Sequence, residues 1–176
     1  MVRIFLVGYM GAGKTTLGKA WAQKLDLSFI DMDGFIENRF HKKIRDLFEE
    51  HGETGFRELE RKILHEVAEF EGVIISAGGG TPCFFDNMDF MNQKGNTVFL
   101  EVSPDILFSR LRMASISRPM LNGKTDEEIR MFILRTLEER IPFYMRAQYT
   151  FSVDKLENHQ QMDKVIDQFC GILQNK

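Results

Sequence analysis

Cysteine is scarce in this sequence, which contains Cys83 and Cys170 and no other among its 176 residues. The two lie far apart and match neither a zinc-binding spacing nor a disulfide framework. The four histidines show no metal-ligand spacing either. Two isolated thiols are expected in a protein that works in the reducing environment of the cytoplasm.

Long apolar runs and an excess of positive charge are missing too. No apolar stretch approaches the ~18 residues that a membrane-spanning helix needs. The short apolar N-terminus leads into a glycine-rich loop, which excludes a signal peptide. The net charge is −3 and the pI is about 5.8, so no basic surface invites nucleic acid. We therefore expect neither a membrane nor a nucleic-acid partner, and local cations must hold any anionic ligand.

Internal repeats, low-complexity segments and linkers are also absent. With 43% hydrophobic and 28% charged residues, the composition is that of an ordinary globular protein. A chain of this length can bury a substantial core. We expect a single domain over residues 1–176 that acts as a monomer.

The most informative stretch is residues 8–15, GYMGAGKT, which matches the phosphate-binding pattern G-x-x-x-x-G-K-[ST] at every position. The apolar residues 4–7 precede it and are long enough for one buried strand. Apolar positions at helical spacing follow it over residues 17–25. A loop between a strand and a helix is the context that this motif requires.

The residue types of this loop explain how it binds a nucleotide. Glycines let the backbone approach a ligand closely, and the N–H groups that open the helix favour phosphate charge. Lys14 can reach the β- and γ-phosphates of ATP, and the Thr15 hydroxyl can ligate Mg²⁺. The expected ATP-binding residues in the loop are Gly11, Ala12, Gly13, Lys14, Thr15 and Thr16.

Asp31 and Asp33 lie where a second predicted strand, residues 27–32, ends. Two acids one residue apart at a strand end are expected to point to opposite sides, so they can serve different tasks, one facing a metal and the other a substrate. A plainer alternative is that Asp33 caps the next helix, but beside a phosphate loop we favour function for both. The apolar strand ending in Asp that often accompanies such a loop is absent, so Ser76 or another acid must support the metal. Asp31 is the candidate.

Arg57 opens a long amphipathic helix, with Glu60 three residues later. The pair is equally well interpreted as a surface ion pair, worth roughly a few tenths of a kcal/mol, or as an anion-binding arginine steadied by Glu60. Residues 73–77, VIISA, predict a strand buried on both faces, and the three glycines 78–80 follow it. Bare backbone at the carboxyl end of a strand is where open α/β sheets bind ligands.

Residues 112–124, RMASISRPMLNGK, lack apolar periodicity and are polar, basic and small. We expect a mobile flap here, in which Pro119 stiffens the segment that carries Arg118. The alternative is a plain basic surface loop. An arginine on a flap near a phosphate loop can stabilise the charge of a transferring phosphoryl group, so Arg118 is a candidate for catalysis and ATP binding.

Strands alternate with helices along the whole chain. Further strands are predicted over residues 97–102 and 149–153, and the helical stripe of residues 44–48 is expected to break at 51–55. A helix that starts near residue 125 should end or kink at Pro142. The alternation predicts a three-layer α/β/α fold with a five-stranded parallel sheet, the size of a small phosphotransferase with a P-loop kinase fold.

Taken together, these motifs resemble shikimate kinase over almost the whole chain, and their order and spacing carry the resemblance. The matching segments are the phosphate loop, Asp31-Met32-Asp33, Phe56-Arg57-Glu58-Leu59-Glu60, Ser76-Ala77-Gly78-Gly79-Gly80, Arg118-Pro119-Met120-Leu121 and Glu139-Arg140-Ile141-Pro142-Phe143-Tyr144. The family transfers the γ-phosphate of ATP to the 3-hydroxyl of shikimate with Mg²⁺, in the pathway to chorismate and the aromatic amino acids.

On the nucleotide side, the resemblance implies that Lys14 holds the phosphates. Thr15 would hold the metal, with Asp31 supporting it through water, and Arg118 would close onto the phosphates from a lid over residues 112–124. The family places an adenine-stacking arginine early in the lid, and Arg110 and Arg112 both compete for that role.

On the substrate side, the resemblance implies a binding segment over about residues 33–60. Asp33 would contact the shikimate hydroxyls, while Arg57 and Arg140 grip the carboxylate. The backbone of Gly78, Gly79 and Gly80 would line the pocket. Glu60 would orient Arg57, and Phe48 and Phe56 would wall the ring.

Two alternatives to a shikimate kinase come from other functional classes. One is another small-molecule kinase of this fold, such as a gluconate kinase, against which the triple glycine and Arg57 argue. The other is a non-catalytic nucleotide-binding regulator, which would not need Asp33 as a partner for a reacting hydroxyl.

Overall fold

The computed structural model describes residues 2–113, 123–154 and 159–174. Its elements, in chain order, are β1 Arg3–Val7, α1 Lys14–Leu25, β2 Ser28–Asp31, α2 Met32–Phe40, α3 Ile44–Val67, β3 Val73–Ser76, the 3₁₀ turn η1 Thr81–Cys83, α4 Asn87–Lys94, β4 Asn96–Glu101, α5 Pro104–Met113, α6 Asp126–Tyr144, β5 Tyr149–Ser152 and α7 His159–Gln174. Each predicted strand is present, with ends that differ by one or two residues from the prediction.

The five strands form one sheet in the order β2-β3-β1-β4-β5, and every pairing is parallel. Strand β1 is central, with Ile4 opposite Ile74 of β3 and Asn96 of β4. This position explains why β1 and β3 read as unbroken apolar runs, since helices cover both of their faces. The predicted α/β/α architecture is confirmed.

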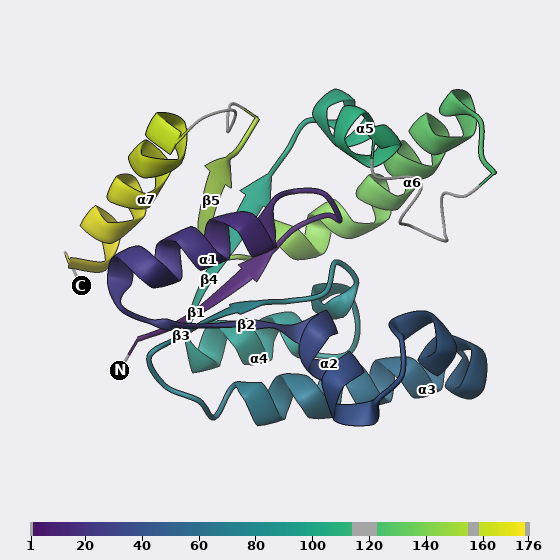
Figure 1. Cartoon of the computed structure of the whole chain (residues 1–176), viewed down its shortest axis with the longest axis horizontal. Helices are drawn as coiled ribbons and strands as arrows, with labels where there is room; N and C mark the ends of the chain where they lie inside the picture. The colour runs from purple at the N-terminus through teal and green to yellow at the C-terminus, as the bar shows by residue number, and fades with distance from the viewer. Residues whose placement is uncertain (1, 114–122, 155–158, 175–176) are drawn as a thin grey trace.

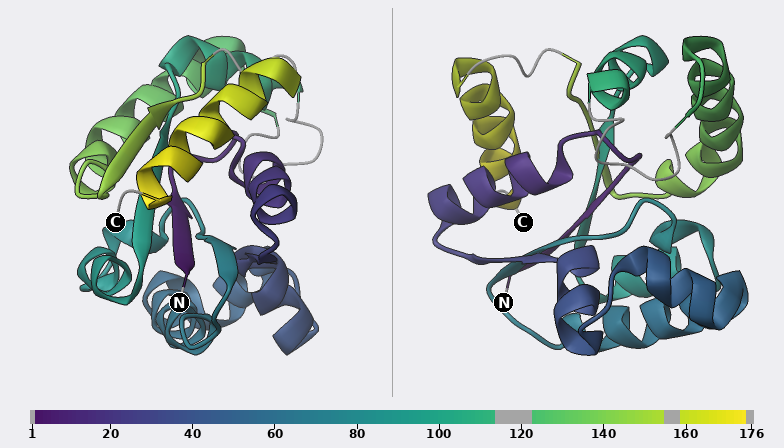
Figure 2. Two further views of the ribbon diagram at one scale, coloured as in Figure 1. Left: turned by 90° about the vertical axis from the view of Figure 1, so that its left-hand side faces the viewer. Right: turned by 45° about the vertical axis from the view of Figure 1, so that its right-hand side comes forward.

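Helices α1 and α7 pack together on one face of the sheet, while α4 lies on the opposite face (Figures 1 and 2). Trp21 of α1 is fully buried, and its ring stacks on Phe169 of α7 at 4.8 Å between centroids. The side chain therefore belongs to the core, as its place on the apolar face of the helix indicates. None of the helices in the described ranges is long and apolar enough to cross a membrane.

The expected break of the helical stripe at residues 51–55 is confirmed, whereas the expectation for Pro142 needs correction. Within α3, Gly52 takes non-helical angles (φ 66°, ψ 179°), so two helical segments meet at a kink there. Glycine allows this because it has no Cβ to clash at positive φ. Helix α6 continues through Pro142 to Tyr144, where the Met145 N–H still donates to the Ile141 carbonyl at 2.9 Å.

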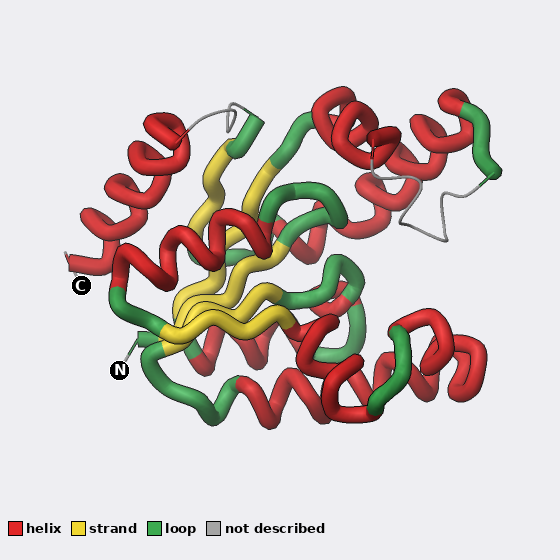
Figure 3. The backbone as a smooth tube through the Cα atoms, in the orientation of Figure 1, coloured by secondary structure: helices red, strands yellow, loops and turns green. Residues whose placement is uncertain are grey.

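Because the sheet is parallel, the carboxyl ends of all its strands meet at one edge. The loops after β1 and β3 and the start of α2 lie together at that edge (Figure 3). The phosphate loop (residues 8–15) and the glycine loop (residues 78–80) thus become neighbours, although about sixty residues of chain separate them.

Candidate active site

The phosphate loop curls tightly because its glycines take backbone angles that other residues avoid. Gly8, Gly11 and Gly13 have φ of 144°, 81° and 93°. At Gly8 a side chain is excluded by space as well, since a Cβ would lie 2.8 Å from the Leu100 carbonyl oxygen. Gly13 then leads into α1, which begins at Lys14. The N–H groups of the first turn therefore open toward the space that the loop encloses.

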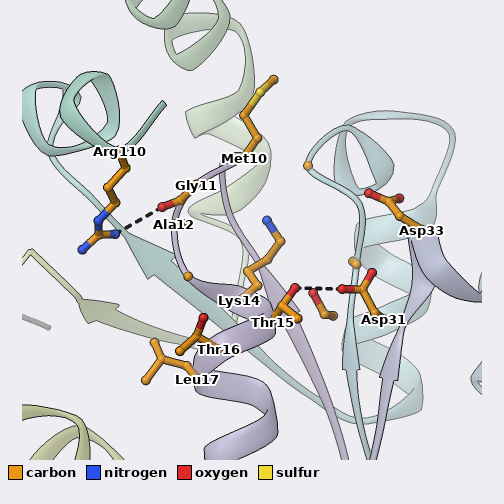
Figure 4. Close-up of a pocket in the computed structure, with 14 residues that line it drawn as sticks. Met10, Gly11, Ala12, Lys14, Thr15, Thr16, Leu17, Asp31, Asp33 and Arg110 are labelled. Atoms are coloured by element: carbon orange, nitrogen blue, oxygen red, sulfur yellow. Dashed lines mark hydrogen bonds between the residues drawn. The ribbon is translucent and has the colours of Figure 1, made fainter. Parts of the chain in front are cut away.

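A cavity of about 460 Å³ lies over the loop. Its walls include the phosphate loop, both acids after β2, the end of β3, the glycine loop and α5. Lys14 is half-buried, and its amine donates to the carbonyls of Gly8 at 2.7 Å and Tyr9 at 3.0 Å. Figure 4 shows the Lys14 amine between Met10 and Asp33. The cavity thus brings a cation, helix N–H groups and carboxylates together.

Asp31 and Thr15 are directly hydrogen-bonded across the cavity. The Thr15 hydroxyl donates to Asp31 Oδ2 at 2.7 Å (Figure 4). Asp31 is also the N-cap of α2, where its Oδ1 accepts from the Gly34 N–H at 3.5 Å. The capping alternative therefore named the wrong acid, because α2 begins at Met32, two residues earlier than an Asp33 cap requires. Asp31 combines the cap with a position beside Thr15.

Asp33 lies in the first turn of α2 and lines the same cavity as Asp31. The expectation that the two acids point to opposite sides is wrong, since α2 starts between them and the strand periodicity ends there. Surrounding protein atoms exclude water and raise the pKa of Asp33 to about 6, and the charges of Asp31 and Glu60 act in the same direction. Lys14 opposes them. The Asp33 surface stays open to the cavity, so solvent screens this effect.

Each glycine of the glycine loop leaves room for a functional side chain. A Cβ on Gly78 would lie 3.0 Å from Asp33 Oδ1 and 2.9 Å from Glu60 Oε1. On Gly79 it would lie 3.3 Å from Arg140 Nη1, and on Gly80 it would lie 2.7 Å from Arg57 Nη2. Side chains on the loop residues would therefore clash with acids and arginines that approach the loop from several elements.

Arg57 is buried, with 8% of its surface exposed, so its pair with Glu60 is not a surface ion pair. Its Nη1 binds Glu60 Oε2 at 2.9 Å, and Glu60 is itself 2% exposed. The guanidinium carbon lies 4.2 Å from the ring centroid of Phe84 and 5.3 Å from that of Phe48. Phe48 stacks on Phe56 at 4.0 Å. The aromatic rings therefore hold the cation in place from the sides.

Arg140 reaches the glycine loop from α6. Its guanidinium lies 5.7 Å from the Tyr9 ring centroid. The Tyr144 hydroxyl, one turn later on α6, donates to the Gly79 carbonyl at 2.5 Å. Burial raises the pKa of Tyr144, with Arg140 acting in the opposite direction, so the hydroxyl stays protonated as a donor. The bond fixes the last turn of α6 to the loop.

The two arginines reach neighbouring glycines, Arg140 at Gly79 and Arg57 at Gly80. Burial raises the pKa of the Cys83 thiol to about 11, and both Arg140 and Arg57 act against that shift. Two cations therefore lie near one thiol just after the glycine loop. Neither arginine lines the cavity over the phosphate loop, so they form an adjoining cationic site with Gly79 at the boundary.

The two candidate arginines for the nucleobase point to different places. Arg110 of α5 lines the cavity and donates to the Gly11 carbonyl at 3.2 Å and the Val153 carbonyl at 3.2 Å (Figure 4). Arg112 is exposed and pairs with Asp126 at 3.1 Å. Arg118, and most of the expected flap, lie outside the described residues.

Sequence reasoning missed two groups of this site. Thr81 is fully buried beside Glu60, and Tyr9 faces Arg140 from within the phosphate loop. Neither gives a sequence signal, because a threonine after glycines and an aromatic residue in a loop have many other uses. Among the described residues, no group of three or more His, Cys, Asp or Glu side chains could hold a metal by itself.

Comparison with known proteins identifies relatives of this chain. A family profile described as shikimate kinase matches residues 10–170. A shikimate kinase from Bacteroides thetaiotaomicron is 60% identical over 174 residues, which cover 99% of each chain. The crystal structure of a shikimate kinase from the same organism superposes with a TM-score of 0.95, at 60% identity and 98% coverage of both chains. A shikimate kinase from Acinetobacter baumannii, solved in complex with shikimate, has a TM-score of 0.85 at 32% identity and covers 100% of this chain and 95% of its own.

Proposed function

The chain belongs to the shikimate kinase family, and we propose that it transfers the γ-phosphoryl group of ATP to the 3-hydroxyl of shikimate. The products are ADP and shikimate 3-phosphate, on the way to chorismate and the aromatic amino acids. The observation that carries this proposal is the cationic site of Arg57 and Arg140, which adjoins the phosphate loop at the glycine loop and has Asp33 beside it.

The nucleotide side is assigned to the cavity over the phosphate loop. The N–H groups from Gly11 to Thr16 surround the phosphates, and the Lys14 amine leaves its carbonyl partners to bind them. Arg110 stacks on the adenine, because it lines the cavity while Arg112 is engaged with Asp126. Arg118 approaches the phosphates from the lid, residues 112–124.

Thr15 and Asp31 fit a magnesium ion that the family implies. Mg²⁺ in such sites keeps most of its water and takes few protein ligands in addition to phosphate oxygens, so one hydroxyl and one nearby carboxylate suffice. Their 2.7 Å hydrogen bond shows that the two side chains already point at one place. When bound, the ion would neutralise charge on the β- and γ-phosphates.

Shikimate is assigned to the segment of residues 33–60, the glycine loop and Arg140. A planar guanidinium matches a carboxylate through two parallel hydrogen bonds, so Arg57 and Arg140 hold the acid end. Asp33 accepts a hydrogen bond from the reacting hydroxyl and aligns it with the phosphate. With a pKa of about 6 it is ionised at neutral pH and can take the proton as the bond to phosphorus forms.

We also infer that the working enzyme is a cytoplasmic monomer. Cys83 and Cys170 are both free thiols, which fits a reducing compartment. Sedimentation at several protein concentrations tests the monomer, and a concentration-dependent mass would contradict it.

The proposal is tested first by measuring ADP release with shikimate, quinate, gluconate and nucleoside monophosphates. Shikimate should support the highest kcat/KM. A preference for gluconate would indicate another small-molecule kinase. Nucleotide binding without ADP release on any of these acceptors would indicate a regulator.

A second test addresses the carboxylate clamp. Arg57→Lys and Arg140→Lys should each weaken shikimate binding by about 1.5–3 kcal/mol, the scale of a charge-assisted hydrogen bond, and leave ATP binding nearly unchanged. Wild type should discriminate strongly against an analogue whose carboxylate is an amide, and each variant less so. Arg135→Lys is the matched control, because Arg135 is exposed on α6 and pairs with Glu139. If the variants reject the amide as strongly as wild type does, Arg57 and Arg140 do not bind the carboxylate.

A further inference from the structure

Thr81 is the first residue of η1, directly after the glycine loop, and its side chain is fully buried. Its hydroxyl donates to Glu60 Oε1 at 2.6 Å. The other carboxylate oxygen, Oε2, binds Arg57 Nη1 at 2.9 Å. Thr81, Glu60 and Arg57 therefore form a continuous buried chain of hydrogen bonds.

A buried carboxylate needs a partner for each oxygen, because an unsatisfied charged oxygen away from water is costly. Arg57 occupies one oxygen of Glu60, and the Thr81 hydroxyl occupies the other. With both oxygens held, the plane of the carboxylate cannot rotate. The direction from which it accepts the Arg57 N–H is then fixed as well.

The Thr81 hydroxyl is itself held in place by the backbone around it. The Thr81 N–H donates to the Gly78 carbonyl at 3.1 Å, and Asn87 Nδ2 donates to the Thr81 carbonyl at 2.9 Å. Asn87 is fully buried at the start of α4. The hydroxyl oxygen also occupies space that Gly78 leaves bare, since a Cβ there would lie 2.8 Å away from it.

Arg57 depends on Glu60 for its orientation. Its other carboxylate neighbour in the described chain, Glu53, lies 3.6 Å away and is 66% exposed. The ring of Phe84 restricts the guanidinium from one side but specifies no direction for its N–H groups. Small rotations of a planar fork spoil its match to a carboxylate.

We propose that Thr81 is a positioning residue for substrate binding, which acts through Glu60 to set the orientation of the Arg57 guanidinium toward the carboxylate of shikimate. The inference rests on the proposed role of Arg57 and adds a specificity element that touches neither substrate nor nucleotide.

The test compares Thr81→Val, which keeps the shape of the side chain but lacks the donor, with Thr81→Ser, which keeps the donor. Thr81→Val should raise the KM for shikimate about tenfold, as loss of a charge-assisted bond implies, with kcat and the KM for ATP within about twofold of wild type. Thr81→Ser should stay close to wild type. For the amide analogue, Thr81→Val and wild type should have the same KM. Thr81→Ala replaces Thr81→Val if the latter does not fold by circular dichroism.

A double-mutant cycle shows whether the effect passes through Arg57. In an Arg57→Lys background, Thr81→Val should change the KM for shikimate by less than about twofold, because coupled residues are non-additive. If Thr81→Val raises the KM equally in both backgrounds, or leaves the KM of the single variant unchanged, the inference about Thr81 is wrong. Neither result contradicts the binding of the carboxylate by Arg57 and Arg140. If Arg57→Lys itself leaves the KM for shikimate unchanged, Arg57 does not bind the carboxylate, and the inference about Thr81 is wrong as well.

Discussion

Asp31 and Asp33 are two carboxylates one residue apart that stand in different surroundings. Asp31 accepts hydrogen bonds from Thr15 and from the first turn of α2. Asp33 has a raised pKa because protein atoms displace water and other acids lie nearby. Environments that push the pKa values of two acids apart commonly give the two acids different roles.

The first prediction concerns the pH dependence of turnover. Asp33 must be ionised to accept a proton, so kcat/KM for shikimate should be half-maximal near pH 6, approach its full value about one pH unit higher and fall below pH 6. Below pH 6, kcat/KM should fall about tenfold for each further unit of decreasing pH. The weak residual activity of Asp33→Asn should show no such decrease. A wild-type profile that is level between pH 5 and 7 would contradict this assignment.

The same shift predicts how Asp33 affects stability. Its folded pKa lies above the unfolded value, so its contribution is present below pH 3.8 and is lost as the pH rises through about 6. Ionised Asp33 therefore destabilises the fold at pH 7, and Asp33→Asn should melt at a higher temperature than wild type there. The difference should shrink as the pH is lowered to 5. Thermal unfolding at both pH values measures it.

The second prediction concerns the metal. Asp31→Ala removes the carboxylate beside Thr15, so turnover should require about tenfold or more Mg²⁺ for half-maximal rate, in line with the loss of a group that supports a metal. Asp163→Ala, an exposed acid on α7, is the control. An unchanged Mg²⁺ titration in Asp31→Ala would exclude Asp31 from the site.

At the scale of elements, side chains of α3, α2 and α6 converge on the glycine loop. Arg57 and Glu60 approach it from α3, Asp33 from α2, and Arg140 and Tyr144 from α6. The approaches of the two acids and the two arginines depend on a missing Cβ. The loop therefore sets the distance between Asp33 and the two arginines.

The third prediction tests that dependence with Gly80→Ala. Gly80 has ordinary helical angles (φ −87°, ψ −22°), so alanine suits its backbone, but its Cβ would lie within 3.0 Å of three guanidinium atoms of Arg57. Displacing Arg57 should raise the KM for shikimate about tenfold or more and leave the KM for ATP nearly unchanged. Gly171→Ala is the matched control, since nothing lies within 4 Å of its Cβ. If both variants bind shikimate equally, the loop does not position Arg57.

At the scale of the whole molecule, the site joins elements from most of the chain. The phosphate loop follows β1, Asp31 ends β2, the glycine loop follows β3, Arg110 lies on α5 and Arg140 on α6. A ligand that contacts all of these elements binds the folded chain and not the unfolded one. Its binding should therefore stabilise the fold as a whole.

The fourth prediction follows from that coupling. Shikimate at 100 times its Kd should stabilise the protein by about 2.7 kcal/mol, which raises Tm by about 5–10 °C for a chain of this size. Arg57→Lys at the same shikimate concentration should show at most about half of that increase, because its Kd is higher. Gluconate should leave Tm unchanged. Equal stabilisation of wild type and Arg57→Lys by shikimate would show that Arg57 does not hold the ligand.

The sequence alone determined those features that depend on consecutive residues. The phosphate loop is readable because backbone geometry, glycine placement and the following helix all act within eight positions. The buried strands can be predicted because β1 and β3 are covered on both faces and are apolar over residues 4–7 and 73–75. The α/β order then leaves few topologies, and the parallel sheet is one of them.

Tertiary structure alone decided which distant side chains meet. The sequence leaves open whether Arg57 and Glu60 form a surface ion pair, and only the structure shows that both are buried. Arg110 and Arg112 are two residues apart on α5, and the rotation of that helix sends one to the cavity and the other to Asp126. Thr81 carries no local signal, because its partner lies 21 residues away. Such contacts depend on how elements pack, which no periodicity within a single segment specifies.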